Sequence, residues 1–273
     1  MTERAEKMTR LNDELRKLDS VVVGFSAGVD SSFLAAAAQK ILGDRAVAVT
    51  ACSATLPERE RQDATAVADF IGVRHVFLDA DEMESTEFVA NGADRCYHCK
   101  KLRFSRMVEW AKEHGYQWVL DGSNADDVGD YRPGMKAVGE LNAVRSPLLE
   151  VGLTKAEIRQ QSKEWGLPTW DKPSAACLSS RIVYGLPITT ERLGQIEQAE
   201  EIIRELCRNQ VRVRHHGELA RIEVSAEDIP VLADPVNSAR VVAALKKIGF
   251  AFVTLDLAGY RTGSLNETLR NRQ

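Results

Sequence analysis

Short apolar runs alternate with helix-like segments over the first 170 residues, and this alternation limits the possible folds more than any other feature of the sequence. The apolar runs span residues 20–25, 46–50, 75–80 and 118–123, and helical patterns span 31–42, 57–71 and 99–114. Strands separated by helices form a parallel sheet with right-handed crossovers and helices on both faces. The sequence therefore predicts an α/β fold whose ligands bind beyond the carboxyl ends of the strands.

A different pattern begins after the turn-rich segment "TWDKPSAACLSSRIVYGLP", residues 169–187. A helical pattern over 190–207 is followed by two strand-like runs, "VRVRHH" and "LARIEV", then by a helix over 239–248 and a last strand, "FVTLDL". This order predicts a small α+β domain. We therefore expect a large α/β domain over 1–170, an active-site loop or linker over 171–189, and a smaller α+β domain over 190–273, for substrate binding or oligomerisation.

The composition is that of an ordinary soluble globular protein, with 44% hydrophobic and 28% charged residues. The opening "MTERAEKMTRLNDELRKLDS" is charged throughout, and no apolar run approaches the length of a membrane span. We therefore expect a cytoplasmic protein without a membrane partner. A net charge of −4 argues against a general nucleic-acid binder and favours a small anionic ligand.

The stretch "VVVGFSAGVDSS", residues 21–32, joins the first predicted strand to a helix through small residues. Backbone N–H groups and the helix dipole face a bound phosphate in such a turn. Neither GxxxxGK[ST] nor GxGxxG is present. A lysine is needed where a γ-phosphoryl group is transferred, whereas a loop without it suits a pyrophosphate leaving group. A tight turn that serves packing alone is the alternative. The candidate residues are Ser26, Gly28, Val29, Asp30, Ser31 and Ser32, of which the last three could cap the helix.

The segment "SAGVDSS" resembles the SGGxDS signature of the PP-loop ATP pyrophosphatase superfamily, with Ala27 in place of a glycine. The resemblance implies a PP-loop fold that uses ATP and Mg²⁺. Alanine at this position is strained if the backbone needs a positive φ, and harmless if it is extended. Further ATP-binding residues are expected at the same sheet edge, with ordinary loop capping as the alternative: Ala51, Gly122, Asp127 and Lys155.

Four segments, residues 120–137, 179–185, 211–224 and 249–269, closely resemble the LarE family, and the resemblance covers nearly the whole chain. LarE proteins are ATP-dependent sulfur transferases that build the nickel-pincer nucleotide cofactor of lactate racemase. They adenylate a carboxylate of pyridinium-3,5-biscarboxylic acid mononucleotide and replace its oxygen with sulfur. The resemblance implies a small nucleotide substrate and a homo-oligomer, trimeric or hexameric. A nickel-insertion protein of the same pathway is a possible partner.

Several charged residues are candidates for holding the substrate. Arg212 and Arg214, two apart on a predicted strand, point to the same side and could form a fork for phosphate or carboxylate. Ser180 and Arg181 lie in the loop expected to fold over the same edge, and Arg132 lies in "DYRPG". A solvated surface is the alternative for the arginines. Three acids could form a divalent cation site or face water: Glu200, Glu201 and Asp228.

The sulfur source can be inferred from the spacing of the five cysteines. In LarE proteins that sacrifice a cysteine, it lies five residues before the arginine of the SSR motif. Ala176 holds that position here, and the cysteine is Cys177. Cys96 and Cys99 form a CxxC with basic neighbours that favour thiolate. The cysteine at position 177 and the CxxC both depart from the sacrificial type, and both resemble the LarE type whose three cysteines bind a [4Fe-4S] cluster. Three cysteines leave one of the four irons without a protein ligand, and this iron could carry external sulfide to the acyl-adenylate.

Several other readings stay open. The three cysteines could bind zinc with His98, His215 or His216, or the CxxC could be a redox motif. Cys52 and Cys207 are predicted to be small buried residues. A tRNA thiolase with a cluster is the closest rival function. A non-catalytic adenine-nucleotide-binding module is the second rival. Amide synthesis is the third, but we find no glutaminase domain in the sequence to supply ammonia.

Overall fold

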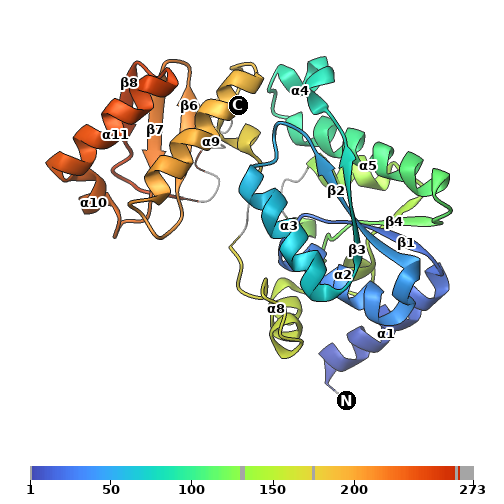
Figure 1. The fold of residues 1–273 in the computed structure, drawn as a ribbon. Coiled ribbons are helices and arrows are strands. Elements are labelled where there is room, and N and C mark those ends of the chain that lie inside the picture. Colours follow the sequence, from blue (N-terminus) through green and yellow to red (C-terminus); the bar gives the residue numbers. More distant parts are fainter. Residues whose placement is uncertain (1, 130–132, 174–175, 262–263, 265–273) are drawn as a thin grey trace. The chain divides into compact units, whose positions relative to one another are not determined.

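The computed structural model describes residues 2–129, 133–173, 176–261 and 264. The chain forms two compact units, each built from two stretches of sequence (Figure 1). Unit 1 consists of Met1–Glu82 and Cys96–Ala175, and unit 2 consists of Met83–Arg95 and Ala176–Gln273. The chain therefore crosses from unit 2 to unit 1 directly before Cys96, and from unit 1 to unit 2 directly before Ala176.

Unit 1 contains the parallel sheet that the alternating pattern predicts. Its five strands lie in the order β3-β2-β1-β4-β5, and all neighbours are parallel. The predicted α/β fold is confirmed. The strands are β1 (Val21–Gly24), β2 (Ala46–Cys52), β3 (Arg74–Asp79), β4 (Trp118–Leu120) and β5 (Val144–Arg145).

Helices pack on both faces of this sheet, because successive residues of a buried strand point to opposite sides. Val21 and Val23 of β1 belong to one apolar cluster, with residues of α1 and α2, whereas Val22 belongs to another, with Phe104 of α5. No helix in the described ranges is long and apolar enough to cross a membrane. The helices of unit 1 include α1 (Glu3–Leu18), α2 (Val29–Leu42), α3 (Glu58–Ile71), α5 (Arg95–Glu113), α6 (Pro133–Gly139), α7 (Pro147–Glu150) and α8 (Lys155–Glu164).

Unit 2 has a three-stranded mixed sheet in the order β6-β7-β8, with β6 and β7 antiparallel and β7 and β8 parallel. Its apolar core joins this sheet to the helices α9 and α11. The predicted α+β composition is confirmed. The elements are α4 (Thr86–Val89), η4 (Leu178–Arg181), α9 (Thr190–Arg204), β6 (Arg212–His216), β7 (Leu219–Glu223), α10 (Ile229–Ala233), α11 (Pro235–Ile248) and β8 (Phe252–Leu255).

The segment 83–95 belongs to unit 2, although it lies within the sequence of the predicted large domain. The side chain of Asn91 is fully buried, and its amide donates to the carbonyls of Val183 and Leu186 at 2.9 and 2.8 Å. The backbone N–H of Ile188 donates to the carbonyl of Val89 at 2.9 Å. These contacts fasten the segment to the loop that follows η4.

Ala27 has a φ of 50°, so the position that is glycine in the PP-loop signature does require a left-handed backbone. A non-glycine residue there costs about 1–2 kcal/mol. The Ala27 side chain is also fully buried. The PP-loop of this protein therefore carries local strain.

Substitutions at Ala27 should reveal this strain. We expect Ala27→Val to lower the free energy of unfolding by about 1–3 kcal/mol, because a β-branched residue rarely adopts a positive φ. Ala27→Gly relieves the strain but removes a buried methyl group worth about 0.8 kcal/mol, so its net change should stay within about 1 kcal/mol. Urea unfolding of both variants measures these differences. A valine variant as stable as the wild type would contradict the strain.

Candidate functional site

The turn between β1 and α2 is held by hydrogen bonds between its two serines. The Ser26 N–H donates to Oγ of Ser31 at 3.2 Å, and the two hydroxyls lie 3.1 Å apart. Gly28 is the N-cap residue of α2 and has no side chain with which to cap the helix, so the expected capping by Asp30, Ser31 or Ser32 is wrong. Because the N-cap residue offers no side-chain acceptor, the first N–H groups of α2 are available to a phosphate.

A lysine reaches this turn from a distant segment. Nζ of Lys155 lies 2.5 Å from Oδ2 of Asp30, and the amide of Asn124 donates to the other carboxylate oxygen at 3.2 Å. Lys155 is the first residue of α8, whose start is fixed by a capping box between Thr154 and Glu157. The loop without a lysine of its own therefore has one beside it, 125 residues further along the chain.

The helix that carries the CxxC contacts the same edge of the sheet. Lys100, which follows Cys99, places its Nζ 2.9 Å from Oδ1 of Asp121, directly after β4. The next residue is Gly122, where a Cβ atom would lie 3.4 Å from the backbone nitrogen of Ser31. The end of β4 thus connects the start of α5 to the PP-loop within unit 1.

Two other predicted ATP-binding residues have structural partners. Oδ2 of Asp127 accepts the Asn124 N–H at 3.0 Å, as the loop-capping alternative expected. Ala51 is buried near the end of β2, where it pairs with Leu78 of β3. The assignment of both residues to the ATP site stays a prediction.

Cys96 and Cys99 lie in the first turn of α5, three residues apart, so both thiols can face one ligand. Cys96 is exposed and Cys99 is half-buried. Sγ of Cys99 lies 3.5 Å from the fully buried carboxylate of Glu82, which also contacts Arg103.

Within the described ranges, no three His, Cys, Asp or Glu side chains gather closely enough to hold a metal ion. Cys96 and Cys99 belong to unit 1 and Cys177 to unit 2, so the third predicted ligand comes from the other unit. The donor set itself, three cysteines with two of them one helical turn apart, fits an iron–sulfur cluster. Burial lowers the pKa of His215 to about 4, as for a neutral core histidine.

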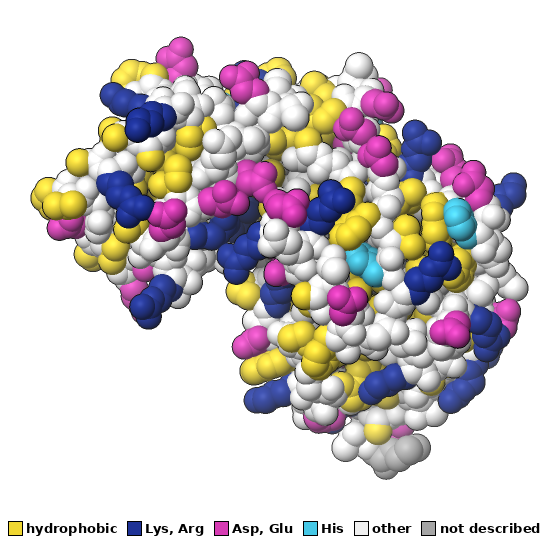
Figure 2. Space-filling view, viewed as in Figure 1, with side chains coloured by type: hydrophobic (Ala, Val, Ile, Leu, Met, Phe, Trp, Pro, Cys, Tyr) yellow, Lys and Arg dark blue, Asp and Glu magenta, His cyan; other side chains and the backbone are white. Residues whose placement is uncertain are grey.

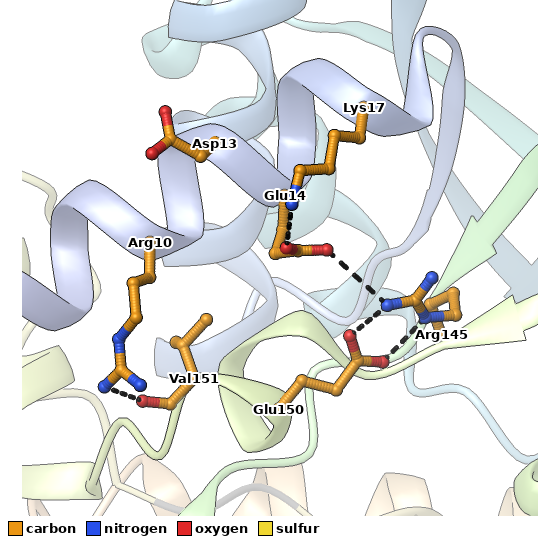
Figure 3. A pocket seen from close by; sticks show the side chains of 7 residues that line it. All are labelled: Arg10, Asp13, Glu14, Lys17, Arg145, Glu150 and Val151. Atoms are coloured by element: carbon orange, nitrogen blue, oxygen red, sulfur yellow. Dashed lines mark hydrogen bonds and ion pairs between the residues drawn. The ribbon is translucent and has the colours of Figure 1, made fainter.

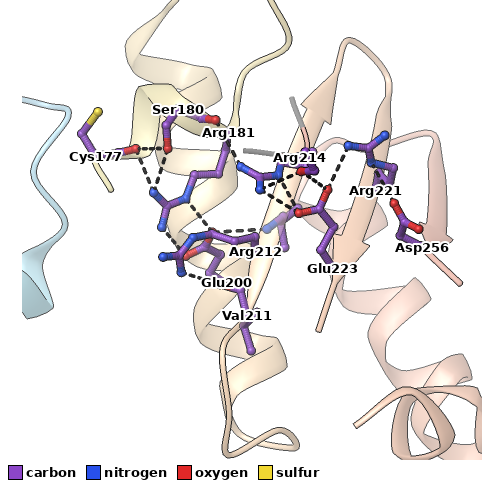
Figure 4. A network of polar contacts seen from close by, with 12 residues as sticks. Cys177, Ser180, Arg181, Glu200, Val211, Arg212, Arg214, Arg221, Glu223 and Asp256 are labelled. Carbon is purple, nitrogen blue, oxygen red and sulfur yellow. Dashed lines mark hydrogen bonds and ion pairs between the residues drawn. The ribbon is translucent and has the colours of Figure 1, made fainter. Parts of the chain in front are cut away.

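Unit 2 contains a network of buried ion pairs, shown in Figure 4. Arg181 pairs with Glu200 at 2.9 Å, and its Nη1 also donates to the carbonyl of Cys177 at 2.8 Å. Burial raises the pKa of Glu200, but the ion pairs with Arg181 and Arg204 outweigh it and hold this pKa below its ordinary value. The same arginine therefore binds a carboxylate and fixes the turn that carries Cys177.

Arg214 is neutralised in a similar way by Glu223. Its Nε and Nη2 donate to Oε2 of Glu223 at 2.9 and 2.7 Å, and its Nη1 donates to the carbonyl of Ser180 at 3.2 Å. The other carboxylate oxygen accepts from Arg221. Arg214 is thus a buried, paired arginine that also contacts the loop containing Ser180.

Arg212 is buried without such a partner. Its Nη1 donates to the carbonyl of Val211 at 2.8 Å, and its guanidinium lies 5.6 Å from the ring centroid of Tyr260. It forms no ion pair with a carboxylate in the part of the chain that the structure describes. Burial, together with the nearby charge of Arg181, lowers the pKa of Arg212 to about 10. A buried cation of this kind is suited to binding an anion.

The three acids of the predicted cation site have different surroundings. Glu200 forms ion pairs with two arginines, and Glu201 is exposed. Asp228 accepts a hydrogen bond from Ser225 at 2.8 Å, at the start of α10. The geometry lends this cation site no support, and it stays a prediction. Arg132 lies outside the described residues.

A hollow of about 400 Å³ lies among α1, β5 and α7 (Figure 3). Its charged residues largely pair with each other, as Arg145 does with Glu150 and Lys17 with Glu14. None of the predicted site residues lines it. We therefore do not assign it to the candidate site.

Sequence reasoning missed Glu223, which neutralises Arg214, and Asn124, which contacts Asp30. In the β6–β7 pair, Arg212 lies opposite Glu223 and Arg214 lies opposite Arg221. Alternating charges in "VRVRHHGELARIEV" were the available signal, but the strand register was needed to connect them.

The five-stranded parallel sheet and the serine-rich turn before α2 define a PP-loop α/β protein. The NAD synthase family model matches residues 3–100, which include this turn. An uncharacterized protein of Synechocystis sp. is 43% identical to this chain over 96% of it and 98% of the relative. The pyridinium-3,5-bisthiocarboxylic acid mononucleotide synthase of Lactiplantibacillus plantarum is 36% identical over 98% and 97%. The chain therefore belongs to the LarE family, that of this synthase.

A more distant relative covers only part of the chain. The tRNA-specific 2-thiouridylase MnmA of Rickettsia rickettsii is 26% identical over 58% of this chain and 53% of its own length.

Proposed function

We propose that this protein is an ATP-dependent sulfur transferase that converts carboxylates of pyridinium-3,5-biscarboxylic acid mononucleotide to thiocarboxylates, on the route to the nickel-pincer nucleotide. The observation that carries the proposal is the ion pair of Lys100 with Asp121. It connects the CxxC helix to the sheet edge that holds the PP-loop. An AMP-forming enzyme that transfers sulfur needs these two parts near each other.

The first step is adenylation of the substrate. A carboxylate oxygen attacks the α-phosphorus of ATP, and pyrophosphate leaves with the electrons of the broken P–O bond. The free N–H groups at the start of α2 can hold the pyrophosphate, and Mg²⁺ can offset its charge. Lys155, now paired with Asp30, can move to the phosphates. The loop and this lysine thus stabilise the leaving group.

Arg212 is proposed to bind the phosphate or a carboxylate of the substrate. Its buried guanidinium has no carboxylate partner in the described ranges, so an anion from the substrate would be its strongest contact. Arg181 and Arg214 are neutralised by Glu200 and Glu223, and we assign them the role of shaping the loop around Cys177 and Ser180.

The second step exchanges oxygen for sulfur. Cys96, Cys99 and Cys177 are proposed to hold a [4Fe-4S] cluster, which, when bound, would keep one iron open for external sulfide. Sulfide attacks the acyl carbon, and the carbon–oxygen bond to AMP breaks. Arg181 and Ser179 keep the Cys177 turn in place, through the 2.8 Å bond to its carbonyl and a 2.9 Å contact with its thiol.

Lys155 provides a prediction for the first step. We expect Lys155→Met to raise the KM for ATP about tenfold or more, because a charge-assisted hydrogen bond contributes about 1.5–3 kcal/mol. Pyrophosphate release measured against ATP concentration gives this value. Lys163→Met is the matched control, since Lys163 lies on the same helix over the Trp170 ring. Equal KM values for both variants would remove Lys155 from the ATP site.

The proposed function is tested by product analysis without oxygen. Protein, ATP, Mg²⁺, sulfide and the biscarboxylic nucleotide are combined, and AMP, pyrophosphate and the thiocarboxylate are quantified. We expect one AMP for each thiocarboxylate. Arg212→Gln should raise the KM for the nucleotide at least tenfold, because it removes a charge-assisted contact. The exposed Arg208→Gln should not change it.

Rival functions predict other products. A tRNA thiolase would form AMP with tRNA and not with the small nucleotide, and a nucleotide-binding module would form no AMP. Basic and acidic side chains are interspersed on the face shown in Figure 2, in contrast to the broad basic face expected of an RNA-binding enzyme. AMP formed with tRNA alone would refute the proposal.

A further inference from the structure

Among the residues of unit 2 that the structure describes, four arginines are buried, and their charges are balanced differently. Arg181 and Arg214 are paired with Glu200 and Glu223. Arg212 is assigned above to the substrate. Arg95 is 4% exposed, and no carboxylate of the described chain forms an ion pair with it. The two proposed reaction steps therefore leave the positive charge of Arg95 without a role.

The contacts of Arg95 are all with neutral groups. Its Nη1 donates to the side-chain oxygen of Asn91 and, at 3.0 Å, to the carbonyl of Ser179. Its guanidinium lies 5.3 Å from the ring centroid of Tyr184. Its Nε is buried without a hydrogen-bond partner. Burying a cation in this way is costly unless an anion comes near it.

The position of Arg95 indicates which anion this is. Arg95 is bonded directly to Cys96, and the carbonyl that it binds belongs to Ser179. Oγ of Ser179 lies 2.9 Å from Sγ of Cys177. Arg95, the residue directly before the CxxC, therefore binds the turn that carries the third cysteine. The anionic groups expected there are thiolates and the sulfide that they help to bind.

We propose that Arg95 is a positioning residue for sulfur transfer, which fixes the Cys177 turn through the Ser179 carbonyl and offsets the negative charge of the sulfur ligands. Asn91 supports it, because its own amide is anchored to the carbonyls of Val183 and Leu186. This inference rests on the proposed function. It adds a residue that acts on the second step and leaves adenylation unaffected.

The test compares Arg95→Gln, Arg95→Lys and a matched control, Arg192→Gln, which removes another arginine–carbonyl contact of unit 2, the 2.6 Å bond to Pro187. The measured quantity is thiocarboxylate formed per pyrophosphate released at a fixed early time within a single turnover. We expect at least a tenfold lower ratio in Arg95→Gln, recovery of at least half by Arg95→Lys, and no change in Arg192→Gln. The rate of pyrophosphate release in the first turnover should be the same in all variants.

A second measurement uses the metal-free protein. Amide hydrogen exchange over η4 should be faster in Arg95→Gln than in Arg192→Gln, because the Ser179 carbonyl loses its donor. An unchanged ratio in Arg95→Gln overturns the inference, and so does a ratio equally low in Arg95→Lys, since charge would then be irrelevant. Equal losses of both products would indicate damage to the fold and also overturn it. A wild type that forms neither product refutes the proposed function and this inference together.

Discussion

Alanine at Cys96, Cys99 or Cys177 is expected to reduce thiocarboxylate formation at least a hundredfold, because a cluster that loses one of three thiolate ligands is no longer held. Pyrophosphate release in the first turnover, before the acyl-adenylate fills the site, should stay within about threefold. Protein purified without oxygen should contain about four iron and four sulfide per chain, and each variant should lose them. Iron and acid-labile sulfide analysis, together with the two product assays, measures this.

The chain offers matched controls for this experiment. Cys207 is buried in the core of unit 2, where burial raises its pKa to about 11, and burial also raises the pKa of Cys52. Alanine at either position should keep iron and sulfide. If the wild type instead binds zinc or no metal, the proposed [4Fe-4S] cluster is refuted. Cys177 would then be a candidate sacrificial donor, and its conversion to dehydroalanine after one turnover should be sought.

The sheet of unit 1 was predictable because its strands are buried on both faces and therefore form continuous apolar runs. The four predicted strands overlap β1 to β4. Helix α1 was missed, although Met8, Leu11, Leu15 and Leu18 follow a helical period and are buried. The many charges of that segment hid the pattern. Strand β5 has only two residues and left no periodic signal.

The site was predictable where it depends on local chain geometry. The PP-loop, the CxxC turn and the SSR turn could each be found in the sequence. The oppositely charged partners of these residues could not be predicted, because they lie far along the chain. Lys155 reaches Asp30 across 125 residues. Glu223 lies opposite Arg212 in the β6–β7 pair, yet it forms its ion pair with the diagonal neighbour Arg214.

A single carboxylate, Glu200, neutralises the arginine that fixes the Cys177 turn, so its loss should be costly for folding. Glu200 is 1% exposed, accepts from Arg181 and Arg204, and also accepts the Val213 N–H at 3.2 Å. Removing one partner of a buried ion pair costs about 3–5 kcal/mol, because the remaining charge is left unpaired. We expect Glu200→Gln to lower the free energy of unfolding by this amount. Glu201→Gln, its exposed neighbour, should change it by less than about 0.5 kcal/mol.

The same pair predicts a difference in pH dependence. The pKa of Glu200 is held below its ordinary value of 4.5, so its ion pairs stabilise the folded protein fully above that value. This contribution is lost as the pH falls below 4.5 toward the lower folded pKa. Urea midpoints measured from pH 7 down to pH 3 should therefore fall less steeply for Glu200→Gln than for Glu201→Gln. Parallel curves would mean that Glu200 is not charged in the folded protein, and the assignment of Arg181 as a neutralised residue would then fail.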